Sequence, residues 1–192
     1  MERNQLLIKH LTILSIPEKS AKTVSFHPQR NLITGENDVG KSSIIKSIYH
    51  SLGADVHFDN VWEKADAISL LTFSYDNRDY KILRSRDHFG LFDIHDNLLQ
   101  SFDSIIKGLS PHFAKLFDNR LQLKQSQTNQ RIPASPAIQF LPFYIDQDKS
   151  WTKPWDSFEG LGVFSSFKRD LINFVAGIRP NEYFLLSERI DQ

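Results

Sequence analysis

The sequence contains no cysteine, so disulfide bonds and thiolate zinc sites are excluded, which fits a reducing compartment. Its seven histidines are scattered and form no close pair with the spacing of metal ligands. Basic and acidic side chains number 23 each, so no global field draws the protein to nucleic acid. Any DNA contact would need a local basic patch.

Long hydrophobic runs are also missing. Lys9 and His10 interrupt the first apolar stretch, so the N-terminus lacks the hydrophobic region of a secretory signal. No run approaches the length of a membrane span. We therefore expect a cytoplasmic protein without membrane contact. Its 192 residues, 40% of them apolar and fifteen of them Phe, are sufficient for one substantial core.

The most specific feature is a phosphate-binding loop. Residues 35–42 read Gly-Glu-Asn-Asp-Val-Gly-Lys-Ser, which matches G-x-x-x-x-G-K-[ST] in full. Asn31–Thr34 is an apolar strand candidate before the loop. After it, residues 41–52 place Ile44, Ile45 and Ile48 on one helical face. Strand, loop and helix follow in the order that this motif needs.

The loop residues have distinct expected roles in holding ATP and Mg²⁺. The glycines allow backbone N–H groups to turn inward and form an anion nest at a positive helix end. Lys41 supplies a charge for the β- and γ-phosphates, and Ser42 a hydroxyl for Mg²⁺. Ser43 packs or caps beside them. The predicted cofactor-binding residues are Gly35, Glu36, Asn37, Asp38, Val39, Gly40, Lys41, Ser42 and Ser43.

The remaining chain predicts an α/β protein. Early strands are expected at residues 5–14 and 23–26, an antiparallel meander at 68–75, 80–84 and 91–94, and a buried strand at 138–145. Helical spacing extends over 102–117, where Gly108 and Pro111 are expected to split the helix, and over 164–175. Residues 125–136 read as an exposed connection. Pro180 suits the first turn of a last helix, in which Tyr183, Leu186 and Ile190 start a heptad pattern.

The early strands, the phosphate loop and the Ile-Ile-Lys-Ser-Ile that follows resemble the N-terminal head segment of SMC-like ATPases, the SbcC, RecN and OLD-type relatives of ABC ATPases. The resemblance implies a P-loop NTPase fold, with residues 1–176 as the first lobe of a head and 177–192 as the start of a coiled coil. It implies ATP-driven pairing of two heads, completion of each head by C-terminal sequence, and action on DNA in repair, chromosome maintenance or phage defence. A stretch with Trp151 and Trp155 is similar to some anti-phage members, although these aromatics suit a core equally well.

The same resemblance assigns Gln147 as a catalytic residue that contacts Mg²⁺ and the attacking water, because it follows a predicted strand. Residues 141–146, a hydrophobic run ending in Asp146, imitate a Walker B strand, but the next residue is not acidic. A signature motif and a true Walker B sequence are absent from this sequence. Asp38, where many relatives carry Gly, should point away from the γ-phosphate or meet a cation. The fragment alone should hydrolyse ATP poorly.

Several alternatives remain open. An OLD-type ATPase would regulate a C-terminal nuclease, and an interaction module would bind nucleotide without turnover. A GTPase would need an N-K-x-D motif, which does not follow the D-x-x-G match at residues 87–90. Arg78, Lys81, Arg84 and Arg86 form either a DNA-binding patch or a solvated strand face.

Overall fold

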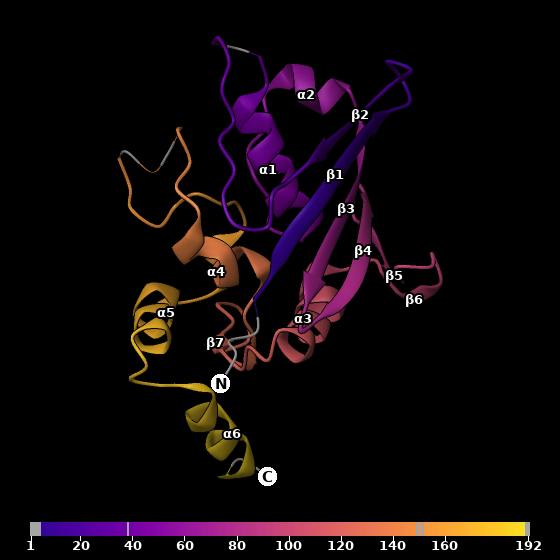
Figure 1. Cartoon of the computed structure of the whole chain (residues 1–192). Helices are drawn as coiled ribbons and strands as arrows, with labels where there is room; N and C mark the ends of the chain where they lie inside the picture. The colour runs from indigo at the N-terminus through magenta and orange to yellow at the C-terminus, as the bar shows by residue number, and fades with distance from the viewer. Residues whose placement is uncertain (1–4, 38, 149, 151, 191–192) are drawn as a thin grey trace. The chain divides into compact units, whose positions relative to one another are not determined.

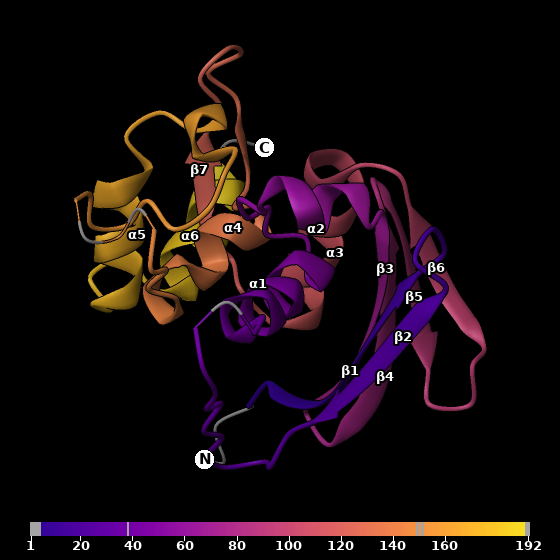
Figure 2. The same cartoon turned by 90° about the horizontal axis from the view of Figure 1, so that it is seen from above.

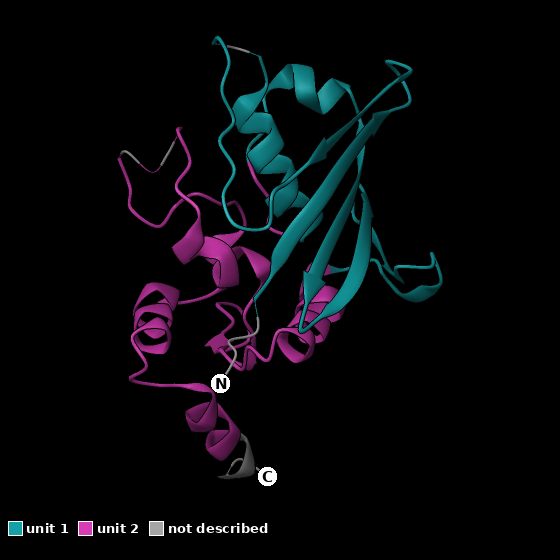
Figure 3. Cartoon of the chain, viewed as in Figure 1, with its two compact units in different colours: residues 1–52, 57–104 teal, residues 53–56, 105–192 magenta. Residues whose placement is uncertain are grey.

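The computed structural model describes residues 5–37, 39–148, 150 and 152–190. Contacts divide the chain into two compact units (Figure 3). Unit 1 comprises residues 1–52 and 57–104, and unit 2 comprises residues 53–56 and 105–192. The expected division at residue 176 into a head lobe and a coil remains a prediction.

Unit 1 is built on a six-stranded antiparallel sheet in the order β2-β1-β3-β4-β5-β6 (Figure 1). The strands are β1 (Leu7–Ser15), β2 (Ser20–Ser25), β3 (Ala67–Tyr75), β4 (Arg78–Ser85), β5 (His88–Asp93) and β6 (Leu98–Phe102). Asp76 and Asn77 join β3 to β4 with positive φ at both positions, as a two-residue hairpin turn requires. The predicted meander is confirmed, and β6 extends it by a strand that we did not expect.

Two helices complete unit 1, α1 (Lys41–Ser51) and the short α2 (Asn60–Lys64). Figures 1 and 2 show α1 lying against one face of the sheet. Leu11, Leu71, Phe73 and Ile82 form the centre of the core and are fully buried. The helix predicted at residues 41–52 is therefore confirmed.

The contact between α1 and the sheet is partly polar. Ser47 and Ser51 are the buried residues of this helix, whereas Ile44, Ile45 and Ile48 are only half-buried. The Ser51 hydroxyl donates to the Ser47 carbonyl at 2.6 Å. The Ser51 hydroxyl oxygen also lies 2.7 Å from the Ser69 hydroxyl oxygen of β3. Small side chains let the helix approach the sheet closely, and the hydroxyls satisfy one another there.

Unit 2 is mainly helical and contains one small hairpin. Its elements are the π-helix η1 (Ile105–Leu109), α3 (Ser110–Leu116), β7 (Gln122–Lys124), β8 (Arg131–Pro133), α4 (Pro136–Phe140), the 3₁₀ turns η2 (Leu141–Phe143) and η3 (Leu161–Val163), α5 (Phe167–Val175) and α6 (Asn181–Ile190). Leu109, Phe113, Leu123, Ile138 and Leu171 are among its most buried apolar side chains. The expected break within residues 102–117 is confirmed, because helix type changes between Leu109 and Ser110.

Two strand predictions are wrong. Residues 138–143 lie in α4 and η2 and residues 144–145 in no regular element, since Pro136 occupies the first helical turn and Pro142 the first turn of η2. Residues 31–34 pair with no strand in the described part of the chain, and the Leu32 side chain is 89% exposed. An apolar run without a sheet neighbour has no ladder to join, so its propensity alone does not make it a strand.

Candidate functional site

The phosphate loop of unit 1 leads directly into α1. Gly40, at the N-cap of this helix, has a left-handed backbone with φ of +84°, a conformation that glycine adopts without steric cost. Gly35 has φ of +156°, and a Cβ there would lie 3.0 Å from the Val39 side chain. Gly40 thus has a backbone conformation that favours glycine, and the role of both glycines in binding phosphate stays a prediction. Asp38, whose side chain we expected to turn from the γ-phosphate, lies outside the described residues.

The first turn of α1 favours an anion. The helix begins at Lys41, and its first backbone hydrogen bond joins the Ile44 amide to the Gly40 carbonyl at 3.1 Å. No acidic side chain lies in this turn. The amides at a helix N-terminus carry partial positive charge, so this turn would attract a phosphate and contributes no carboxylate of its own.

The Lys41 side chain folds back onto the loop that precedes it. Its ammonium donates to the Gly35 carbonyl at 3.0 Å and, at shorter range, to the Glu36 carbonyl. Ser42 beside it is exposed, and Ser43 is half-buried. The lysine and the serine that should hold phosphate and Mg²⁺ are therefore neighbours at the same loop. Asn37 and Val39 complete the exposed part of the described loop.

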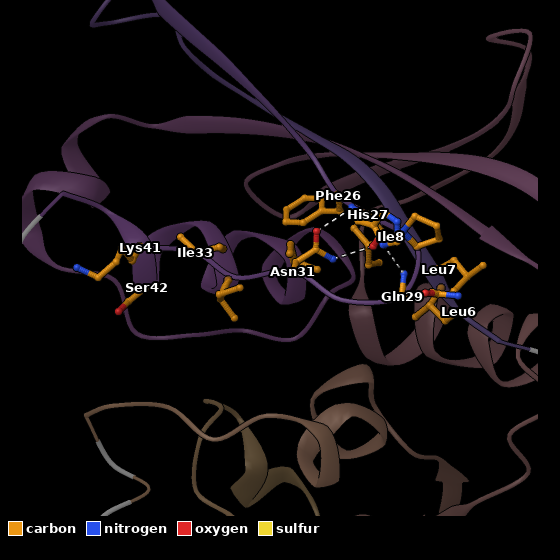
Figure 4. Close-up of a pocket in the computed structure, with 13 residues that line it drawn as sticks. Leu6, Leu7, Ile8, Phe26, His27, Gln29, Asn31, Ile33, Lys41 and Ser42 are labelled. Atoms are coloured by element: carbon orange, nitrogen blue, oxygen red, sulfur yellow. Dashed lines mark hydrogen bonds between the residues drawn. The ribbon is translucent and has the colours of Figure 1, made fainter. Parts of the chain in front are cut away.

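A pocket of about 510 Å³ opens beside this loop within unit 1. Figure 4 shows Lys41 and Ser42 at one end of the pocket and Leu6, Leu7 and Gln29 at the other, with Asn31 and His27 between them. The side-chain amide of Asn31 donates to the His27 backbone carbonyl at 2.8 Å, and its oxygen accepts from the His27 backbone N–H at 2.7 Å. These two hydrogen bonds fix the turn between the two residues. Most of the lining is apolar and includes Ile33, Ile45 and Ile48.

The opposite end of α1 is held by a buried arginine. Arg84 of β4 is 4% exposed, and its guanidinium donates to the His50 carbonyl in the last turn of α1 at 2.7 Å. It also donates to the Arg86 carbonyl at 2.9 Å and lies 4.8 Å from the centre of the Phe89 ring. A cation at the C-terminal carbonyls complements the helix dipole. Arg84 therefore anchors the helix that carries the phosphate loop.

This placement corrects the interpretation of the basic cluster. Arg84 is buried, so it belongs neither to a DNA-binding patch nor to a solvated strand face. Arg86 pairs with Asp66 at 2.6 Å, and Lys81 pairs with Asp96 at 2.6 Å. A patch of four basic side chains available to DNA phosphates is not present on this strand pair.

His50 lies beside this anchor and stays neutral. Burial, and secondarily the charge of Arg84, lowers the pKa of His50 from 6.5 to about 3. Its ring packs edge-on against Phe58, with centroids 5.4 Å apart. A neutral imidazole avoids placing a second cation next to Arg84.

Gln147 belongs to unit 2, whereas the phosphate loop belongs to unit 1. The glutamine is exposed in a bend, and the strand that should precede it is the α4–η2 helical segment. The strand-then-glutamine arrangement is thus absent, and the role of Gln147 toward Mg²⁺ and water stays a prediction from the resemblance alone.

Asp146 has a structural role. Its carboxylate is buried and accepts hydrogen bonds from the Ser150 amide and the Ser150 hydroxyl, each at 2.7 Å. The residues before it form a 3₁₀ turn. Residues 141–146 thus form no strand, in keeping with the expectation that they only imitate a Walker B sequence.

Sequence reasoning missed two groups of residues, the anchor formed by Arg84 and His50 and the aromatic pair of Phe58 and Trp62. The alternation of β4 contained a signal for the first, because residues 82 and 84 share a strand face. No comparable signal marked the second. In the described part of the chain, no cluster of three acidic or histidine side chains could hold a metal, and no helix has the length and apolar character of a membrane crossing.

Comparison with family models gives no match. Two curated proteins are similar to this chain, both named Lamassu protein LmuB. The one from Bacillus cereus (strain VD014) is 34% identical over 170 residues, which cover 88% of this chain and 29% of the relative. The one from Bacillus sp. (strain NCIM 5461 / CCTCC AB 2011126 / NIO-1130) is 32% identical over 148 residues, which cover 76% of this chain and 25% of the relative. The chain thus spans between a quarter and three tenths of the length of these curated relatives.

Proposed function

We propose that this chain is the ATP-binding part of an SMC-like ATPase head that acts in anti-phage defence. ATP with Mg²⁺ would bind at residues 35–43, with Lys41 on the terminal phosphates and Ser42 on the metal. The similarity to Lamassu proteins supports the defence role. The observation that carries nucleotide binding is a left-handed Gly40 followed at once by Lys41 at the acid-free start of α1.

Hydrolysis would need sequence beyond this chain. The carboxylate of Asp146, which ends the run that imitates a Walker B strand, accepts hydrogen bonds from Ser150. The matched relatives are more than three times as long as the aligned segment, so they have room for a Walker B strand and a signature motif.

Residues 31–34 also support the proposal that further sequence completes this head. This apolar segment runs directly into the phosphate loop, yet it pairs with no described strand and leaves Leu32 exposed. Ile33 faces the pocket lined by Ile45 and Ile48 of α1. Apolar surface of this kind is stabilised by a covering partner. We propose that strands from the C-terminal half of the same head cover it, and that two such heads pair when ATP binds.

Calorimetry tests the binding step. Titration of ATP with Mg²⁺ into the protein should release heat that Lys41→Ala abolishes while the circular dichroism spectrum is unchanged. Lys64→Ala is the matched control, since Lys64 is exposed at the end of α2 and lines neither pocket beside the loop. Retained ATP affinity in Lys41→Ala would exclude the loop as the nucleotide site. Nucleotide-dependent dimerisation of the complete protein without turnover would favour the interaction module instead.

A further inference from the structure

A second pocket of unit 1 touches the phosphate loop, with a volume of about 500 Å³. It shares Val39 and Gly40 with the loop and Ile44 with α1, but neither Lys41 nor Ser42 lines it. Those two residues line the first pocket. In the motif, the lysine serves the β- and γ-phosphates and the serine serves Mg²⁺, so the terminal phosphates should face the first pocket. The nucleoside then leaves the loop on another side, where the second pocket lies.

The walls of the second pocket suit a flat apolar group. Ile13 of β1, Val24 of β2 and Ile44 of α1 line it, and the small side chains of Ala65 and Ala67 leave room. Its volume lies in the range of roughly 300–1,000 Å³ that is usual for small-ligand sites. Figure 1 shows α2 near the end of the sheet where β1 turns into β2. Residues of α2 and of the β1–β2 hairpin supply the remaining lining of the pocket.

Trp62 provides an aromatic wall whose position is fixed from two sides. The Asp59 carboxylate accepts from the Val61 amide at 3.0 Å and the Trp62 amide at 2.8 Å, which starts α2 at this point. The indole stacks on Phe58, with ring centroids 5.5 Å apart and planes inclined by 22°. Phe58 in turn packs on His50 of α1. The ring is therefore held in place before any ligand binds, which lowers the entropic cost of stacking.

Polar groups that could read the edge of a base are scarce in this pocket. The Ser15 hydroxyl donates to the Ala65 carbonyl at 2.6 Å and accepts from the Glu18 amide at 3.2 Å, so its hydrogen-bonding capacity is largely used. The other polar lining side chains, Glu18, Ser20 and Lys22, are exposed in or beside the β1–β2 turn. Stacking tolerates any base, because every base presents a π-face.

From this arrangement we infer that the pocket between the β1–β2 hairpin and α2 takes the base of the nucleotide, with Trp62 as its stacking wall and with little discrimination between adenine and guanine. The inference rests on the proposed function, since it assumes that the phosphates bind at the loop.

Binding of three probes to the purified protein tests it: ATP, GTP and inorganic tripolyphosphate, each with Mg²⁺. We expect ATP and GTP affinities within about tenfold of each other, because base stacking is largely insensitive to base identity. Trp62→Ala should weaken ATP about tenfold, which is the usual scale of one base–aromatic stack, and leave tripolyphosphate unchanged. Trp62→Phe should retain most of the ATP affinity. Trp155→Ala, in unit 2, is the matched control and should change neither probe.

Fluorescence offers a second measurement if Trp62→Ala fails to fold. With Trp151→Phe and Trp155→Phe, Trp62 remains as the sole tryptophan of the chain's three. ATP should quench its emission, and tripolyphosphate should not.

Unchanged ATP affinity in Trp62→Ala, or a preference for ATP over GTP above about a hundredfold, would overturn the inference, since such a preference requires edge reading by hydrogen bonds. In that case tripolyphosphate binding that Lys41→Ala abolishes would leave the proposed function intact. If wild-type protein binds none of the three probes, both proposals fail.

Discussion

Acidification should destabilise the protein through His50, whose pKa is about 3 in the folded state. An unfolded histidine has a pKa of about 6.5, so below that pH the unfolded chain binds a proton that the folded chain rejects. The contribution of neutral His50 to stability is therefore complete above about pH 6.5. It is lost progressively as the pH falls from there toward 3.

The expected size follows from the distance between the two pKa values. At about pH 5, only the unfolded imidazole is protonated, and the difference of about 1.5 pH units from 6.5 corresponds to about 2 kcal/mol at 1.36 kcal/mol per unit. Asp66 and Asp93 also have shifted pKa values, each lowered mainly by a hydrogen-bonding side chain. Their contributions are lost below their ordinary values near 4, outside this window. His112, with its pKa lowered by burial, acts in the same direction as His50.

Comparison with His50→Gln isolates the effect, because the variant keeps His112 and all carboxylates. Urea unfolding followed by circular dichroism should show that the wild-type protein loses about 2 kcal/mol more than the variant between about pH 7.5 and pH 5. NMR should show no titration of the His50 ring protons above about pH 4. An equal loss in both proteins, or a His50 titration near pH 6.5, would refute the reasoning.

Three other substitutions have defined outcomes. Ser42→Ala should weaken ATP binding about tenfold in Mg²⁺ but little in EDTA, as measured by calorimetry, because it removes the hydroxyl proposed for the metal; equal loss in both buffers would contradict this. Gly53→Ala should cost about 2 kcal/mol in urea unfolding, since Gly53 has φ of +83° and a Cβ would lie 2.5 Å from Leu109 Cδ2. Arg84→Met should cost about 3 kcal/mol by losing charged hydrogen bonds to two carbonyls, and DNA affinity in a filter-binding assay should not change.

Local chemistry made part of the fold predictable. The Asp76-Asn77 turn tolerates positive φ, which identified the β3–β4 hairpin, and Pro180 marked the start of α6 one residue later. Gly40 likewise has the left-handed backbone that favours glycine. In each case residues close in sequence determine the conformation, so no knowledge of distant contacts was needed.

The failures arose where distant contacts decide the outcome. An apolar run such as residues 138–145 fits a buried strand or a buried helix, and periodicity does not separate the two. Pro136 was the better signal, since it favours a first helical turn. For residues 31–34 the deciding factor is the presence of a neighbouring strand, which the described residues do not contain. The base pocket joins β1, β2, α1 and α2, so no local pattern could have revealed it.

The two ends of α1 explain why Arg84, whose charge suggested a DNA contact, is buried in the protein. Side chains two apart on a strand share a face, so Arg84 follows the fully buried Ile82 into the core. A buried guanidinium requires partners, and the C-terminal carbonyl of His50 supplies one where the helix dipole is negative. The opposite, positive end of the same helix begins at Lys41. The meander thus holds α1 by its negative end, and the phosphate site that we propose lies at its opposite, positive end.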